Sequence, residues 1–168
     1  MKLIAGSILI ALVASAPSLA QSSKPIELRF ANVPWHLELS LGDMKPIQGF
    51  PSRPDREVFT YRNDKAILSV IVENAHAPAT LDSCRDVFER RKAGMELSKD
   101  VQGQRGDAAT QEYNLSFGDR KAMAFQHNVY SCRVRGTYYI DVHASRINYE
   151  PVNQDGLWAL IDGVAIVE

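Results

Sequence analysis

The chain has 168 residues, with 19 Lys and Arg against 20 Asp and Glu and a formal net charge of −1. This balance argues against nucleic acid as a partner, and the length suits one domain with one core. Beyond residue 20, no segment approaches the ~20 apolar residues that a membrane-spanning helix needs. We therefore expect neither a nucleic-acid partner nor a membrane span.

Residues 1–20 have the three-part pattern of a secretory signal peptide. Lys2 supplies the positive charge, a short apolar stretch follows, and small residues precede the predicted cleavage between Ala20 and Gln21. The apolar stretch is too short for a stable membrane anchor, and its length is typical of bacterial signals. The sequence therefore predicts a bacterial protein that is periplasmic or secreted.

After the signal peptide, we expect a flexible leader over residues 21–25 and a single α+β domain over 26–168. The two cysteines, Cys84 and Cys132, form no C-x-x-C motif. In an oxidising compartment, a widely spaced pair predicts a structural disulfide rather than a redox or metal-binding site.

The first half of the domain has the patterns of strands. Residues 35–41 alternate between apolar and polar side chains, as in a strand with one buried face. Residues 42–57 are rich in Pro and Gly, which predicts a loop. Two strands, at 58–62 and 66–73, flank a turn. The second is almost continuously apolar, so we expect it to be central and covered on both faces.

A helix is predicted from Leu81 to Leu97, because apolar residues recur at helical spacing through Met95. Thr80 is the predicted N-cap residue. The polar residues 98–108, which include two glycines, predict a loop after the helix.

Three further strands are predicted at 111–117, 121–134 and 137–145. The apolar phase of the second switches near His127–Tyr130, which predicts a β-bulge. A short C-terminal helix should follow, and residues 164–167 would either extend it or form an edge strand. The fold class is therefore α+β: a mostly antiparallel sheet with one long central helix and a short C-terminal helix packed on it.

This order of elements resembles the α/β sandwich of the PsbP and Mog1 proteins. The resemblance covers the mature chain in element order: the strand that begins at Trp35, one long helix in the middle, and a C-terminal helix. It implies a non-catalytic role, because that group mostly serves in binding and assembly. No functional residue carries over from it, since no shared motif supports it.

The strand at 137–145 places a row of polar side chains on one face: Thr137, Tyr139, Asp141, His143 and Ser145. The last three are the residue types of a nucleophilic triad, but neighbours on one face of a strand lie about 7 Å apart. Asp141 could still orient His143 as a general base. The alternative is a hydrogen-bonded polar row on the wetter face of the sheet.

Three histidines on predicted strands, His36, His127 and His143, would form a metal site only if their strands converged. We found no H-E-x-x-H motif, and no glycine-rich phosphate loop in the sequence. We therefore expect no metal and no cofactor.

A basic cluster on the predicted helix includes Arg85 and Arg91, and it would suit an acidic partner or serve as a solvated helix face. Several tyrosines and two tryptophans would suffice to line a groove. The expected binding surface combines Thr137 and Tyr139 with Arg85 and Arg91, together with the 42–57 loop.

The sequence thus favours a non-catalytic exported domain that binds a protein or a small ligand in the cell envelope, such as an accessory factor. An immunity or inhibitor protein is one alternative. A small hydrolase or metal-assisted enzyme, with His143 and Asp141 in the active site, is another. A purely structural domain held by its disulfide is the third.

Overall fold

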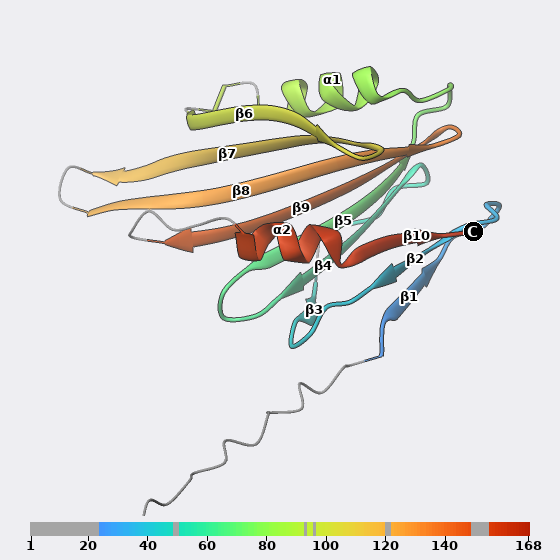
Figure 1. The fold of residues 1–168 in the computed structure, drawn as a ribbon, viewed down its shortest axis with the longest axis horizontal. Coiled ribbons are helices and arrows are strands. Elements are labelled where there is room, and N and C mark those ends of the chain that lie inside the picture. Colours follow the sequence, from blue (N-terminus) through green and yellow to red (C-terminus); the bar gives the residue numbers. More distant parts are fainter. Residues whose placement is uncertain (1–23, 49–50, 93, 96, 120–121, 149–154) are drawn as a thin grey trace, which may run out of the picture.

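The computed structural model describes residues 24–48, 51–92, 94–95, 97–119, 122–148 and 155–168. The predicted signal peptide, its cleavage site at Ala20 and Gln21, and residues 21–23 of the leader lie outside this part of the chain. Within it, strands predominate and two helices are present (Figure 1).

Seven strands form one large sheet in which every neighbouring pair is antiparallel. This confirms the mostly antiparallel sheet. In spatial order the strands are β3 (Lys45–Ile47), β4 (Arg56–Arg62), β5 (Ile67–Asn74), β9 (Tyr138–Asn148), β8 (Ala122–Arg135), β7 (Ala108–Asp119) and β6 (Leu97–Arg105).

One face of the large sheet, called the α2 face here, carries the main core. Its central side chains include Val70, Val129 and Val142, all buried. They pack against α2 (Asp155–Asp162) and against a small antiparallel sheet of β1 (Ile26–Arg29), β2 (His36–Leu39) and β10 (Val164–Val167). The predicted alternation at 35–41 is confirmed, because its apolar side chains are all buried in this core.

The opposite face, called the α1 face, is covered by α1 (Leu81–Lys92). Because side chains alternate along a strand, the neighbours of the α2-face residues point this way. Tyr130 and Cys132 of β8 and Tyr139 of β9 pack with Cys84 and Phe88 of the helix. The molecule thus has three layers, with the large sheet in the middle (Figure 1).

The long central helix was predicted wrongly. Helix α1 has 12 residues and ends at Lys92, and Leu97 begins β6. The physical reason is Gly94, whose φ of 82° is in the left-handed region that ends helices. Met95 consequently leaves the helical stripe. The predicted start is confirmed, since Thr80 Oγ1 accepts a hydrogen bond of 3.1 Å from the Ser83 amide.

The loop predicted at residues 98–108 is wrong as well, because most of these residues form the edge strand β6. An exposed edge strand needs no apolar alternation, so its polar sequence resembled a loop. The bulge predicted near His127–Tyr130 is wrong too, because β8 keeps one continuous register with β7 and with β9. The apolar residues of β8 switch from one face to the other along the strand because different layers cover the two faces of the sheet.

The open question at the C-terminus is settled in favour of an edge strand. Helix α2 ends at Asp162, and β10 then pairs with β2. Gly163 allows this sharp transition, since a Cβ atom there would lie 2.9 Å from the carbonyl oxygen of Ser40. That distance is shorter than side-chain carbons tolerate.

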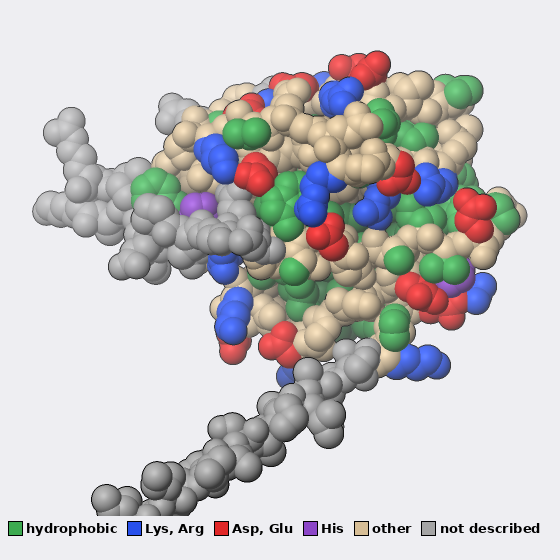
Figure 2. All heavy atoms as spheres, viewed as in Figure 1, with side chains coloured by type: hydrophobic (Ala, Val, Ile, Leu, Met, Phe, Trp, Pro, Cys, Tyr) green, Lys and Arg blue, Asp and Glu red, His purple; other side chains and the backbone are tan. Residues whose placement is uncertain are grey.

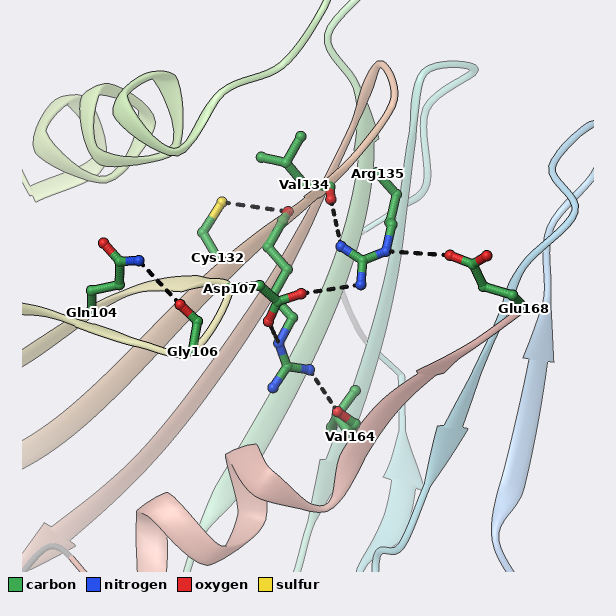
Figure 3. Close-up of polar contacts among 9 residues, drawn as sticks. Gln104, Gly106, Asp107, Cys132, Val134, Arg135, Val164 and Glu168 are labelled. Atoms are coloured by element: carbon green, nitrogen blue, oxygen red, sulfur yellow. Dashed lines mark hydrogen bonds and ion pairs between the residues drawn. The ribbon is translucent and has the colours of Figure 1, made fainter.

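Two arginines of β8 connect the large sheet to the C-terminal strand (Figure 3). Arg133 Nη1 donates a 2.8 Å hydrogen bond to the carbonyl oxygen of Val164. Asp107 lies between the arginines, 3.5 Å from Arg133 Nε and 3.0 Å from Arg135 Nη2. Arg135 Nε also lies 4.0 Å from Glu168 Oε1. This cluster fixes β10, and through it the small sheet, against the large one.

The predicted disulfide is present, and it joins Cys84 of α1 to Cys132 of β8 with both residues fully buried. The link closes a loop with a sequence separation of 48. Closing such a loop stabilises a fold by roughly 4 kcal/mol in the chain-entropy model.

Replacing both cysteines, as C84A/C132A, should lower the free energy of unfolding by that amount, roughly 4 kcal/mol. Urea unfolding of the oxidised protein and of the double variant measures the difference. Equal unfolding midpoints for the two proteins would show that the disulfide adds nothing to stability.

Arg133→Met should destabilise the protein by about 1–3 kcal/mol, because the carbonyl of Val164 loses a charged donor. The matched control is Arg29→Met, which removes an exposed surface arginine and should cost less than about 0.5 kcal/mol. Urea unfolding compares the two variants. A loss no larger than that of the control would mean that the contact does not hold β10.

Candidate functional site

The α1 face has a cavity of about 170 Å³ between the helix and the sheet. Its walls come from strands β4, β5, β7, β8 and β9, from α1 and from the segment after it. The lining residues are Arg56, Val58, Ser69, Ile71, Phe88, Lys92, Met95, Tyr113, Tyr130 and His143.

The cavity exists because the helix covers only part of this face. Strand β5 was predicted to be covered on both sides, and that prediction is wrong. Leu68, Val70 and Val72 are buried on the α2 face, whereas Ile71 on the α1 face is half-buried and Ile67 is 41% exposed. The central strand therefore offers partly uncovered apolar surface beside the helix.

The predicted polar row of β9 points toward the α1 face, and the structure separates its members. Tyr139 and Asp141 are buried, with only 1% of Asp141 exposed, and Asp141 is the register partner of Cys132. Ser145 is buried further along the strand. Only His143 lines the cavity. Thr137 lies in the turn before β9, where its carbonyl accepts a 2.8 Å hydrogen bond from the amide of Ala75.

His143 contacts two side chains from neighbouring strands. Its Nε2 lies 3.0 Å from Asn128 Oδ1 and 3.2 Å from Tyr113 Oη. The Asn128 amide nitrogen donates to the Gln126 carbonyl, which fixes Oδ1 as the atom facing the imidazole. An oxygen acceptor there places a proton on Nε2. His143 is thus a hydrogen-bond donor at the cavity wall, a role different from that of a general base acting through Nε2.

The histidines predicted to converge do not. His127 points to the α2 face, where Nδ1 lies 3.1 Å from Asn114 Oδ1, and His143 points to the α1 face. His36 belongs to the small sheet and lies 3.3 Å from Glu27. Among the described residues, no three His, Cys, Asp or Glu side chains are grouped to hold a metal ion.

The basic cluster on α1 is largely paired with acids. Arg85 Nη1 lies 2.7 Å from Asp82 Oδ1, and Lys92 Nζ lies 2.7 Å from Glu89 and 2.5 Å from Asp100. Burial disfavours the charge of Lys92, but the two carboxylates outweigh it and raise its pKa. The side chain of Arg91 lies outside the described part of the structure.

A second, more open groove of about 520 Å³ lies on the α2 face, between β6 and α2. Arg105 stacks over the ring of Trp158 at 4.4 Å, and the indole donates a 2.7 Å hydrogen bond to Glu112. Lys99 lies 2.6 Å from the same carboxylate. This groove has charged, mutually paired walls, so it offers less apolar contact to a ligand than the α1 cavity.

The sequence suggested His143 as a general base and the aromatic residues as possible groove walls, and Tyr113 and Tyr130 do line the cavity. Sequence reasoning missed Arg56, Val58 and Asn128. No local pattern marks these three, because they meet His143 or its cavity only through strand pairing across the sheet. The 42–57 loop, which was the other predicted surface, contains the short strand β3 and the start of β4.

No protein-family model and no curated protein matches the sequence. None of the described helices is long and apolar enough to cross a membrane. On the face of the molecule shown in Figure 2, basic and acidic side chains are interspersed and neither sign gathers into a patch. That face offers no extended charged surface for a polyanion.

Glu112 should contribute to acid stability. Burial raises the pKa of its carboxyl, but the hydrogen bonds from Lys99 and Trp158 and the charges of Lys99 and Arg105 have the larger effect, so the pKa is lowered from its ordinary value. A carboxylate with a lowered folded-state pKa stabilises the fold above its ordinary pKa, and this contribution is lost as the pH falls through the folded value.

Glu112→Gln should therefore reduce stability at pH 7 and flatten the fall in stability below about pH 4.5. Urea unfolding at a series of pH values measures both effects, with Glu57→Gln at an exposed position of β4 as the control. An acid limb as steep in E112Q as in the parent would contradict the role of Glu112.

Proposed function

We propose that this protein is an exported, non-catalytic domain that binds a small ligand in the cavity between α1 and the large sheet. The observation that supports this most directly is the composition of the cavity wall. Apolar and aromatic side chains surround a few polar groups, among them the Nε2 donor of His143 and the cations Arg56 and Lys92. Small-molecule sites in proteins typically have this composition.

A small ligand is favoured over a protein partner, because two residues of the predicted protein-binding surface already interact within the protein. Tyr139 is buried under α1, and Arg85 is paired with Asp82. An immunity or inhibitor protein would have to recognise its protein partner through exposed residues elsewhere on the surface.

The hydrolase alternative is disfavoured because Asp141, His143 and Ser145 lie in a single strand. Their side chains are therefore spaced along one line and do not converge on a substrate. In a catalytic triad, Nε2 of the histidine faces the serine hydroxyl and accepts its proton. In this structure, Nε2 of His143 faces the amide oxygen of Asn128 instead.

Export is the second part of the proposal. It draws on the signal-peptide pattern of residues 1–20 and on the buried disulfide, since disulfides persist mainly in oxidising compartments. A likeness to the PsbP and Mog1 proteins, whose group is mostly non-catalytic, is also part of the proposal. It is supported by the strand that follows Trp35 and by the C-terminal helix, since the central helix is short.

A fragment screen by NMR on the ¹⁵N-labelled mature protein tests the site. Small aromatic and aliphatic fragments should shift the amide signals of residues around His143 and Ser69, and Val58→Trp should abolish these shifts by filling the cavity. The matched control is Val101→Trp, since Val101 is exposed on the α2 face and lies outside the cavity. Shifts that persist in V58W, or that cluster at the α2 groove, would overturn the assignment.

A further inference from the structure

The α1 face carries uncovered apolar surface just beyond the end of the helix. Met95 is 48% exposed, Ile67 is 41% exposed and Ile147 is 56% exposed. Ile67 and Ile147 share the α1 face with Ser69 and His143, since they alternate with the residues buried on the α2 face. The cavity therefore opens toward an apolar strip of sheet.

Two cations line the cavity: Arg56 lies at its other end, and Lys92, the last residue of α1, lies beside the apolar strip. Arg56 pairs in register with Glu73, and its Nε lies 3.6 Å from the Glu73 carboxylate, an ion pair too long for a hydrogen bond. The same Nε is buried and has no hydrogen-bond partner among the described residues. The described residues that line the cavity include two cations and no carboxylate.

Of the two cations, Arg56 is the better candidate for a ligand charge. Lys92 already donates to both Glu89 and Asp100, so a further anion would meet two carboxylates around that ammonium group. Among the described residues, Arg56 is paired with one carboxylate, that of Glu73, at a longer distance. A guanidinium also matches a carboxylate in a planar, two-point geometry.

The register orders these features along one line. On the α1 face, the β5 residue Glu73 lies beside Arg56 of β4, and Ile71 lies beside Val58. Ser69 follows beside Thr60, and Ile67 lies at the far end beside the exposed Arg62. Six residues of extended strand span about 20 Å. Both ends of this line carry an arginine, but Arg62 is exposed to water whereas Arg56 is half-buried and lines the cavity. The anionic end of an amphiphile would therefore bind at Arg56, with its apolar part over Ile71.

We propose, on the basis of the proposed function, that the ligand is a single-chain aliphatic carboxylate. Its head would bind Arg56, and its chain would run over Ile71 toward Met95 and Ile67. A cavity of about 170 Å³ is smaller than the roughly 300–1,000 Å³ of sites for drug-sized ligands. The cavity would therefore enclose the first part of the chain, and the rest would lie on the open apolar strip.

Calorimetric titration of the mature protein with hexanoate, octanoate and decanoate, below their micellar concentrations, tests this. The affinity should rise roughly fourfold per buried methylene. Octanoate should bind at least roughly tenfold more tightly than octan-1-ol, which lacks the charge. Equal affinities for octanoate and octan-1-ol would overturn the anionic head while leaving the ligand cavity in place.

Three variants locate the head group. Arg56→Gln should weaken octanoate binding roughly tenfold or more without changing the affinity for octan-1-ol. Glu73→Gln should strengthen octanoate binding, because it removes the carboxylate that competes for Arg56. Arg62→Gln, beside Ile67 at the far end of the line, should weaken octanoate binding much less than Arg56→Gln. Arg29→Gln, at an exposed position of the small sheet, is the matched control and should change neither affinity.

Loss of octanoate binding in R62Q but not in R56Q would reverse the orientation and overturn the proposal. Absence of binding by every alkanoate would overturn it as well. The fragment screen then decides separately whether the cavity binds other ligands, so the failure of this inference is distinguishable from failure of the proposed function.

Discussion

The fold depends on how the two faces of the large sheet are buried, because the layers that cover the α1 face and the α2 face differ in size. Strands β5, β9 and β8 carry apolar side chains on both faces. Helix α2 and the small sheet together cover the central strands on one face. On the other lies α1, whose 12 residues make a helix about 18 Å long, whereas the 14 residues of β8 extend about 45 Å. The helix therefore leaves more than half of the strand length to other groups, and the cavity lies at this boundary.

The uncovered end of the α1 face explains its mixture of polar and apolar residues. Next to the helix, Asn128 and His143 satisfy each other by a hydrogen bond, so Asn128 can be fully buried. Farther out, where water reaches the sheet, Ile67 and Ile147 remain exposed. An ordinary solvent-facing sheet would carry polar side chains at those outer positions. The two exposed isoleucines depart from that pattern, and they add to the support that the cavity wall gives for a ligand surface.

The sequence was informative where one layer alone determined the pattern. The alternation from Trp35 to Leu41, the cap at Thr80 and the disulfide are local or compositional signals, and the structure confirms them. It was misleading where two layers acted on one strand. In β8 the α2 layer buries Val129 and the α1 layer buries Tyr130 and Cys132, so a change of covering layer looked like a bulge.

The length of α1 was misjudged for a different reason. Met95 continues the helical spacing, but the left-handed conformation of Gly94 ends the helix before it. Periodicity records which residues are apolar and not where the backbone turns. The same limit applies to the site: Arg56 and His143 are 87 positions apart, and only the pairing of β4, β5 and β9 brings them to one cavity.

The attachment of α1 connects stability to the site. Near its start, the helix is held covalently to β8 through Cys84, and at its end Lys92 is held to β6 by an ion pair with Asp100. The covalent contact is buried and insensitive to salt, whereas ion pairs at partly exposed carboxylates weaken as ionic strength rises. Thermal motion of the helix should therefore be largest at the Lys92 end, which borders the cavity and the apolar strip. A ligand can enter there without breaking the core, because the disulfide keeps the rest of the helix on the sheet.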